Sequence, residues 1–196
     1  MDAFSLLKED HRKVEQLFAQ LESASGKQKL QVFQQIKTEL DLHTHIEEKI
    51  FYPALEEPEE THDLALEAYE EHAVVKNLLK ELGRAKTAND EWEAQAKVLQ
   101  ENVEHHVEEE ENELFPKAES ALGEEEIEAL GEQMEAEKAR KQRGSASKRS
   151  SAKKSASKAA TRSTAAKRTR TTKKSSTKTS KSSGSKRSRK STAKKR

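Results

Sequence analysis

The chain has 196 residues, and it contains no cysteine. That absence excludes disulfides, thiolate zinc sites and a cysteine nucleophile, so any bound metal must be held by nitrogen and oxygen. The formal net charge of +1 hides a division, because 24 of the 37 Lys and Arg residues, but none of the 36 Asp and Glu residues, lie from Lys138 onward. Every Trp, Tyr and Phe lies within residues 1–115. We therefore expect an acidic folded domain followed by a basic arm that cannot build a core.

Apolar residues recur three or four positions apart in successive segments, which is the spacing of amphipathic helices. The first helix is predicted over about residues 5–21, and the second is predicted to carry its stripe as far as Ala54, with Pro53 ending or kinking it. The two stripes consist of Phe4, Leu7, His11, Val14, Phe18 and Leu21, and of Phe33, Ile36, Leu40, His43, Glu47, Ile50 and Ala54.

The third helix is expected to begin at Thr61 as its N-cap and to end at Gly83 as its C-cap. The fourth is expected from about Asp90 to the region of Pro116. Their stripes consist of Leu64, Ala68, His72, Val75, Leu79 and Leu82, and of Trp92, Ala96, Leu99, Val103, His106, Glu110 and Leu114. Four such helices with short connections predict an all-α protein, an antiparallel up-down-up-down four-helix bundle over residues 1–122.

Two further segments follow the predicted bundle. Residues 123–143 are expected to form a short helical extension or linker, in which Ile127, Leu130 and Met134 either pack against the bundle or lead into the tail. Residues 144–196 consist almost entirely of Lys, Arg, Ser, Thr and Ala. Because they have no apolar period, we expect a disordered tail.

The second and fourth helices carry the same motif. Glu47 follows His43 by four residues and Glu110 follows His106 by four, and a proline follows each histidine by ten. Four residues is about one helical turn, so each pair lies on one helix face, where both side chains can reach a single ion. His11 and His72 occupy the stripes of the first and third helices, which makes the two helix pairs internal repeats and implies a pseudo-twofold axis.

These six side chains are our candidate metal ligands. A single histidine on an apolar stripe is most often a core residue, but four such histidines and two glutamates on inner faces are expensive to bury without a cation. Four imidazoles and two carboxylates are too many donors for one tetrahedral zinc ion and suit two ions, for which iron is the best candidate and manganese or zinc are alternatives. The predicted ligands are His11, His43, Glu47, His72, His106 and Glu110.

The spacings of these ligands and the two Phe- and Pro-containing segments after the motifs resemble the hemerythrin-like, HHE cation-binding family over roughly residues 1–120. The resemblance implies an antiparallel four-helix bundle with a non-haem di-iron centre, bridged by the two carboxylates and by an oxo or hydroxo oxygen. Oxygen-carrying hemerythrins have a second histidine on the third helix, whereas here the neighbouring stripe positions are Ala68 and Lys76. The resemblance thus points to the bacterial subgroup with six side-chain ligands, which leaves a coordination position for water, a small oxidant or Tyr69.

The other histidines are expected to be solvated. His45 lies about 200° around the helix from His43, His105 shares a face with Glu109, and His62 lies off its stripe. Glu48, Glu109 and Glu111 are possible partners of the ligands, with no role assigned to them.

The tail resembles the basic tails of linker histones in composition. Without aromatic residues for base stacking, it is expected to bind the phosphates of DNA or RNA without reading their sequence. Two alternatives are that it folds over the acidic body of the protein or that it binds anionic lipid.

The sequence thus predicts a di-iron protein that responds to oxygen, peroxide or nitric oxide, or senses iron or redox state, and is tethered to nucleic acid. The alternatives are a di-iron enzyme that consumes peroxide, with an incidental tail, and a nucleoid-associated structural protein whose metal only stabilises the bundle. No apolar run approaches the roughly 20 residues of a membrane span, and residues 1–5 lack the features of a signal peptide, so we expect a cytoplasmic, nucleoid-associated protein.

Overall fold

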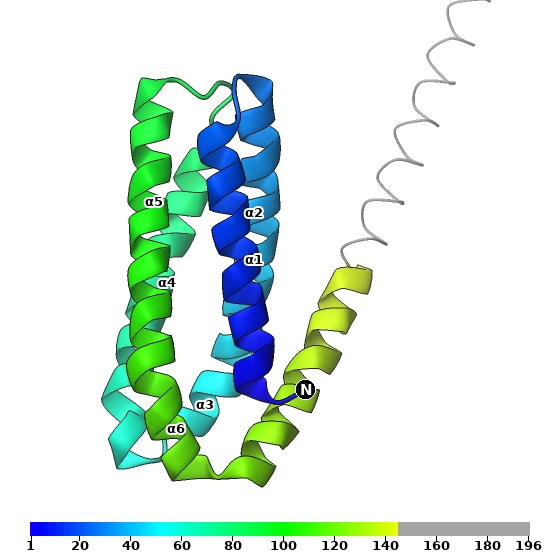
Figure 1. Cartoon of the computed structure of the whole chain (residues 1–196), viewed down its shortest axis with the longest axis vertical. Helices are drawn as coiled ribbons and strands as arrows, with labels where there is room; N and C mark the ends of the chain where they lie inside the picture. The colour runs from blue at the N-terminus through cyan, green and yellow to red at the C-terminus, as the bar shows by residue number, and fades with distance from the viewer. Residues whose placement is uncertain (145–196) are drawn as a thin grey trace, which may run out of the picture. The chain divides into compact units, whose positions relative to one another are not determined.

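Four long antiparallel helices form the body of the protein (Figure 1). A computed structural model describes residues 1–144. The helices are α1 (Ala3–Ser23), α2 (Lys27–Ile46), α4 (Glu59–Leu82) and α5 (Asp90–Glu109). The predicted up-down-up-down bundle is confirmed. The predicted tail lies outside the described residues, apart from its first residue, Gly144.

The helix ends follow from local capping. Asp2 caps α1 by accepting a hydrogen bond from the Ser5 N–H at 2.8 Å, and Asn89 caps α5 through the Trp92 N–H at 3.1 Å. The prediction that Thr61 is an N-cap is wrong. Helix α4 already begins at Glu59, and the buried Thr61 hydroxyl donates to the Leu55 carbonyl at 2.7 Å. Thr61 therefore ties α4 to the preceding segment and does not start the helix.

Two π-helical turns interrupt the second and fourth helices at corresponding places. They are η1 (Glu47–Phe51), followed by α3 (Tyr52–Leu55), and η2 (Glu110–Leu114), followed by α6 (Phe115–Leu122). Each π turn holds one more residue than an α-helical turn, so it rotates the downstream stripe. The predicted core positions Ile50 and Ala54 are consequently only half-buried, whereas Phe51, Tyr52 and Leu55 are fully buried. Pro53 lies in the first turn of α3, where proline is tolerated, so it does not end the helix as predicted.

The core consists of two apolar clusters. One surrounds Phe33 and Trp92, which meet edge to face with ring centroids 5.5 Å apart, and the other surrounds Phe51, Tyr52 and Phe115. The four stripe histidines lie in sequence between residues of the first cluster and residues of the second. A polar layer therefore separates the two clusters halfway along the bundle.

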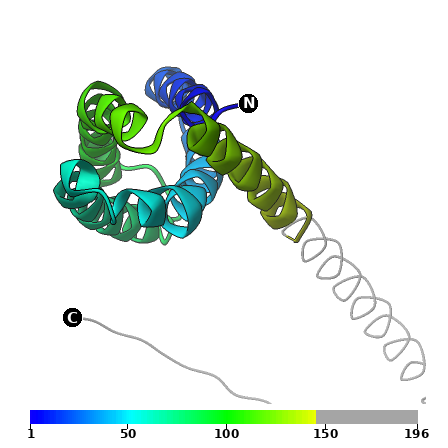
Figure 2. The ribbon, with the colours of Figure 1, turned by 90° about the horizontal axis from the view of Figure 1, so that it is seen from below.

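Residues 124–144 form a further helix, which runs beside the N-terminal end of α1 (Figure 2). Its Ile127, Leu130 and Met134 are buried in the second cluster. On its other turns, Lys138 pairs with Asp10, and Glu137 accepts hydrogen bonds from His45 at 2.8 Å and Lys49 at 2.7 Å.

This helix changes the assignment of one histidine. We expected His45 to be solvated, but its contact with Glu137 leaves its side chain 28% exposed. His62 and His105 are exposed, as predicted. Among residues 1–144, no helix combines the length and apolarity that crossing a membrane requires.

Gly131 provides a test of this packing. An alanine usually stabilises a helix interior by about 1 kcal/mol relative to glycine. Here, a Cβ atom on Gly131 would collide with the Met1 carbonyl oxygen and with the backbone of Asp2. We expect Gly131→Ala to lower the free energy of unfolding by about 1–3 kcal/mol, as overpacking does. Gly144→Ala is the control, because nothing lies within 4 Å of its Cβ position. Denaturant unfolding measures both, and an increase in stability for Gly131→Ala would contradict the packing.

Candidate metal centre

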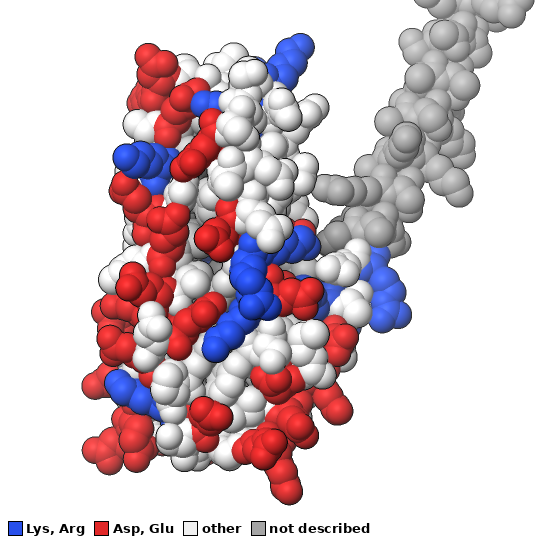
Figure 3. All heavy atoms as spheres, viewed as in Figure 1, with Lys and Arg blue, Asp and Glu red and all other residues white. Residues whose placement is uncertain are grey.

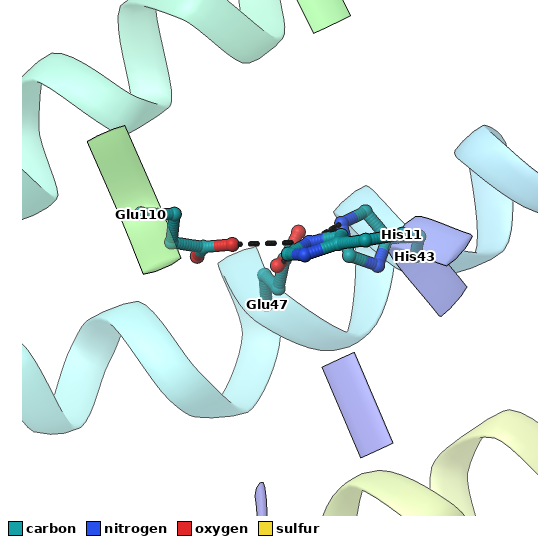
Figure 4. A group of neighbouring side chains, drawn as sticks. All are labelled: His11, His43, Glu47 and Glu110. Atoms are coloured by element: carbon teal, nitrogen blue, oxygen red, sulfur yellow. Dashed lines mark hydrogen bonds and ion pairs between the residues drawn. The ribbon is translucent and has the colours of Figure 1, made fainter. Parts of the chain in front are cut away.

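All six predicted ligand residues meet in the polar layer. His11, His43, His72 and His106 come from α1, α2, α4 and α5, and Glu47 and Glu110 are the first residues of the two π turns. Each of the six residues is at most 6% exposed. Figure 4 shows Glu110 reaching from its own helix toward His11, with His43 and Glu47 beside it.

The ligand atoms form two groups that share a carboxylate. In the first, His11 Nε2 lies 3.2 Å from His43 Nε2 and 3.2 Å from Glu110 Oε2, and Glu47 Oε1 lies 3.2 Å from His43 Nε2. In the second, His72 Nε2 lies 3.2 Å from His106 Nε2 and 3.4 Å from Glu47 Oε2. Within each group, all ligand atoms lie within 4.8 Å of one another. The two oxygens of Glu47 thus face different groups, as a bridging carboxylate would.

Glu110 also lies between the groups. Its Oε2 is 3.2 Å from His11 Nε2 and 4.0 Å from His106 Nε2. The pseudo-twofold relation expected from the repeated motif is therefore present in the arrangement of the side chains.

Each histidine turns its Nε2 inward and its Nδ1 toward a carboxylate outside the centre. The Nδ1 atoms of His11, His72 and His106 lie 2.7, 3.0 and 2.7 Å from carboxylate oxygens of Glu111, Glu48 and Glu71. His43 Nδ1 faces Asp10 at 3.8 Å. A carboxylate on the outer nitrogen fixes the ring and favours the tautomer whose inner nitrogen is free to bind a metal.

These outer partners follow the internal repeat. Asp10 and Glu71 directly precede His11 and His72 in the sequence, and Glu48 and Glu111 directly follow the two inner glutamates. Glu48 and Glu111 were candidates without a role, whereas Asp10 and Glu71 were missed. The signal that would have found them is their matched position beside the repeated ligands. Glu109 contacts His105 at 3.5 Å instead of a predicted ligand.

The donor set fits a bound cation. Both oxygens of Glu47 and Glu110 Oε2 are buried without a hydrogen-bond partner, and such groups are costly to bury unless a cation compensates them. Burial, together with the Glu110 carboxylate, raises the pKa of Glu47 well above its usual value. Burial alone would also raise the pKa of Glu110, but the imidazoles of His11 and His106 outweigh it and lower that pKa to about 2.

Tyr52 lies at the centre, and Tyr69 does not. The Tyr52 hydroxyl donates to Glu110 Oε1 at 3.2 Å and lies 3.3 Å from His72 Nε2. Burial and the charge of Glu110 raise the Tyr52 pKa well above its usual value, so the hydroxyl keeps its proton near neutral pH. Tyr69 instead donates to Glu56 Oε1 at 3.0 Å. The π turn explains why periodicity missed Tyr52, since a regular helix would turn this residue away from the core.

A small cavity adjoins the four imidazoles on the side of the first apolar cluster. The remaining residues that line it are mostly aliphatic: Val14, Leu40, Thr44, Val75, Val103 and Val107. Such walls suit a small uncharged molecule better than an ion.

Fold and site together define a helical bundle with a buried, nitrogen- and oxygen-based cation site. The family model of the hemerythrin HHE cation binding domain matches residues 2–118. The chain belongs to this family.

Two similar proteins add detail. A crystal structure of a hemerythrin HHE cation binding domain-containing protein from Mycobacterium kansasii matches with a TM-score of 0.64 and 28% identity, over 71% of this chain and 86% of that one. A DNA nickase from Nostoc sp. (strain PCC 7120) is 30% identical over 129 residues, which are 65% of this chain and 36% of the nickase. The chain therefore spans little more than a third of the nickase's length.

The outer carboxylates yield a prediction. Replacing such a partner typically reduces metal affinity about 10- to 100-fold, because the ligand ring loses its orientation and basicity. We expect this loss for Glu71→Gln, measured by competition with a chelator. Glu108→Gln, which removes the same charge from an exposed position of α5, is the control. Equal affinities for the two variants would show that Glu71 does not tune His106.

Proposed function

We propose that this protein binds two iron ions through His11, His43, Glu47, His72, His106 and Glu110, with manganese or zinc as alternatives. The observation that carries the proposal is the convergence of four imidazoles and two carboxylates around buried acceptor atoms without hydrogen-bond partners. Iron held there would supply redox chemistry toward small oxygen or nitrogen oxide molecules. We propose accordingly that the centre responds to oxygen, peroxide or nitric oxide, or senses iron or redox state.

The protein's own residues support that role. The aliphatic cavity beside the imidazoles would admit a small uncharged molecule and exclude bulk water. The Tyr52 hydroxyl retains its proton and can donate a hydrogen bond at the centre. The outer carboxylates of Glu48, Glu71 and Glu111 hold three of the rings in fixed orientations.

We further propose that the basic segment, residues 144–196, tethers the metal-binding unit to DNA or RNA. Its composition supports this, because it gathers Lys and Arg without acidic residues, and such segments bind phosphates by releasing counterions. The name of the Nostoc relative, a DNA nickase, adds support for a place beside DNA. On this proposal, residues 1–122 form the metal-binding bundle, residues 123–143 connect it to the tail, and the protein is cytoplasmic and nucleoid-associated.

Two other functions make different predictions. A peroxide-consuming enzyme with an incidental tail would turn over peroxide rapidly without residues 144–196. A nucleoid-associated protein that uses metal only for stability would behave alike on DNA with zinc or with iron.

The tether is tested by comparing the full chain with a version ending at Arg143, each loaded with iron or zinc, on duplex DNA across a range of salt. If about ten charges meet phosphates, the log of the binding constant should fall with the log of salt concentration at a slope near −9. The shortened chain should lose this binding. Equal retention of both chains on DNA would contradict the tether. Supercoiled plasmid in the same assay would reveal nicking.

A further inference from the structure

The two halves of the bundle differ just outside the ligands. When the two halves are aligned on the ligand repeat, His11 matches His72 and His43 matches His106. The same alignment matches the residues that flank these ligands. In the first half, the residues within five positions of a ligand include Leu6, Leu42 and Ile46. The corresponding residues of the second half are Glu67, His105 and Glu109. Three apolar residues of one half are thus three ionisable residues in the other.

In the first half, this region is covered. Leu6 and Ile46 are buried in the same cluster as Ile127, Leu130 and Met134 of the helix at residues 124–144. Lys138 of that helix pairs with Asp10, the outer carboxylate that faces His43. A cation would therefore meet a lysine and an apolar layer on this side.

In the second half, the corresponding surface is open within residues 1–144. Glu67 is exposed, and the His105 side chain is 64% exposed. The surface of α5 visible in Figure 3 is largely acidic, whereas Lys and Arg gather beside α1 and the helix of residues 124–144. Positive charge thus lies near the covered half and negative charge along the helix that carries His105.

Three side chains on the open side have the spacing of a metal site. His105 Nε2 lies 3.5 Å from Glu109 Oε1 and 3.9 Å from Glu71 Oε1. The ligand atoms of all three residues lie within 4.8 Å of one another. Glu71 is shared with the buried centre, because its other oxygen, Oε2, lies 2.7 Å from His106 Nδ1. One carboxylate therefore joins this exposed cluster to a ligand of the centre.

A cavity leads inward from this cluster. Its polar lining consists of Glu67, Glu71 and Glu109 toward the surface and of the buried His106 and Glu110. Leu64, Ala68 and Leu114 form the rest of its wall. Glu110 is 2% exposed, and its Oε2 accepts no hydrogen bond. The cavity thus runs between acidic surface groups and a buried acceptor that requires a cation.

We propose that Glu71, His105 and Glu109 form an outer divalent-cation site, through which cations enter the buried centre by this cavity. The proposal rests on the proposed function, since it supplies the same centre. One imidazole and two carboxylates suit Fe²⁺, Mn²⁺ or Zn²⁺. Partial exposure suits transient binding, in which the cation exchanges some of its water for these ligands before it moves inward.

The loading rate tests the entry route. Metal-free full-length protein is mixed with Fe²⁺ without oxygen, and the metal retained after rapid desalting is measured over time. The variant His105→Ala/Glu109→Gln keeps all six buried ligands and Glu71. An acidic cleft raises association rates by about 10- to 1,000-fold. Because this variant keeps Glu67 and Glu71 but loses two of the three outer ligands, it should load several-fold more slowly and reach the same final content. Glu108→Gln, the charge-matched control, should load at the wild-type rate. Equal rates for the double variant and wild type would overturn the entry route while leaving the buried centre intact.

A second measurement separates the outer site from the buried centre. In a His43→Ala/Glu47→Gln/His106→Ala/Glu110→Gln background, only His11 and His72 remain of the buried ligands, and the outer site should still bind one Mn²⁺. The electron paramagnetic resonance signal of free Mn²⁺ reports this binding during a titration. Adding His105→Ala/Glu109→Gln should abolish it. Identical Mn²⁺ binding with and without these two changes would overturn the outer site, whatever the buried centre does.

Discussion

The burial of two carboxylates among four imidazoles is the constraint on which the structure depends. Taking such groups out of water costs several kcal/mol per charge unless cations or hydrogen bonds compensate them. Every long helix must therefore deliver a histidine to the same level of the bundle, and the apolar core is divided into two clusters around that level. The two π turns begin at the inner glutamates, so the irregular backbone coincides with the site.

The outer carboxylates extend this constraint to the surface. Each imidazole has an acidic residue facing its outer nitrogen, and each of these residues is adjacent in sequence to an inner residue. Two adjacent residues can thus have different roles: one lies in the centre, and the other faces the Nδ1 atom of a histidine on another helix. Because the chain repeats this arrangement, one small set of positions specifies both halves of the site.

Much of the fold and of the site could be predicted from the sequence, because both depend on helical periodicity. Apolar residues spaced three or four positions apart identified the four long helices. The histidines and glutamates that interrupt these apolar stripes are the side chains that meet in the centre. Periodicity could not reveal the π turns, since an extra residue in one turn leaves no mark in composition. For this reason Tyr52 was missed, and Ile50 lies half-buried at the edge of the second cluster instead of within it.

Contacts between separate elements were equally out of reach. The hydrogen bond from Thr61 to Leu55 and the pairing of His45 with Glu137 depend on how segments fold back on one another. The pairing of Lys138 with Asp10 is of the same kind. The helix that carries Lys138 covers one half of the repeated site, whereas the other half is uncovered within residues 1–144. A repeat in sequence therefore implies equivalence only for the residues that it contains.

The most direct test of the central claim is the metal content and visible absorption of the full chain purified from iron-supplemented cells. The His43→Ala/His106→Ala variant should be prepared alongside it. The account predicts two irons per wild-type chain, with the charge-transfer absorption of a bridged di-iron centre, and the loss of both in the variant. A colourless, folded wild-type protein with less than one metal per chain would contradict it.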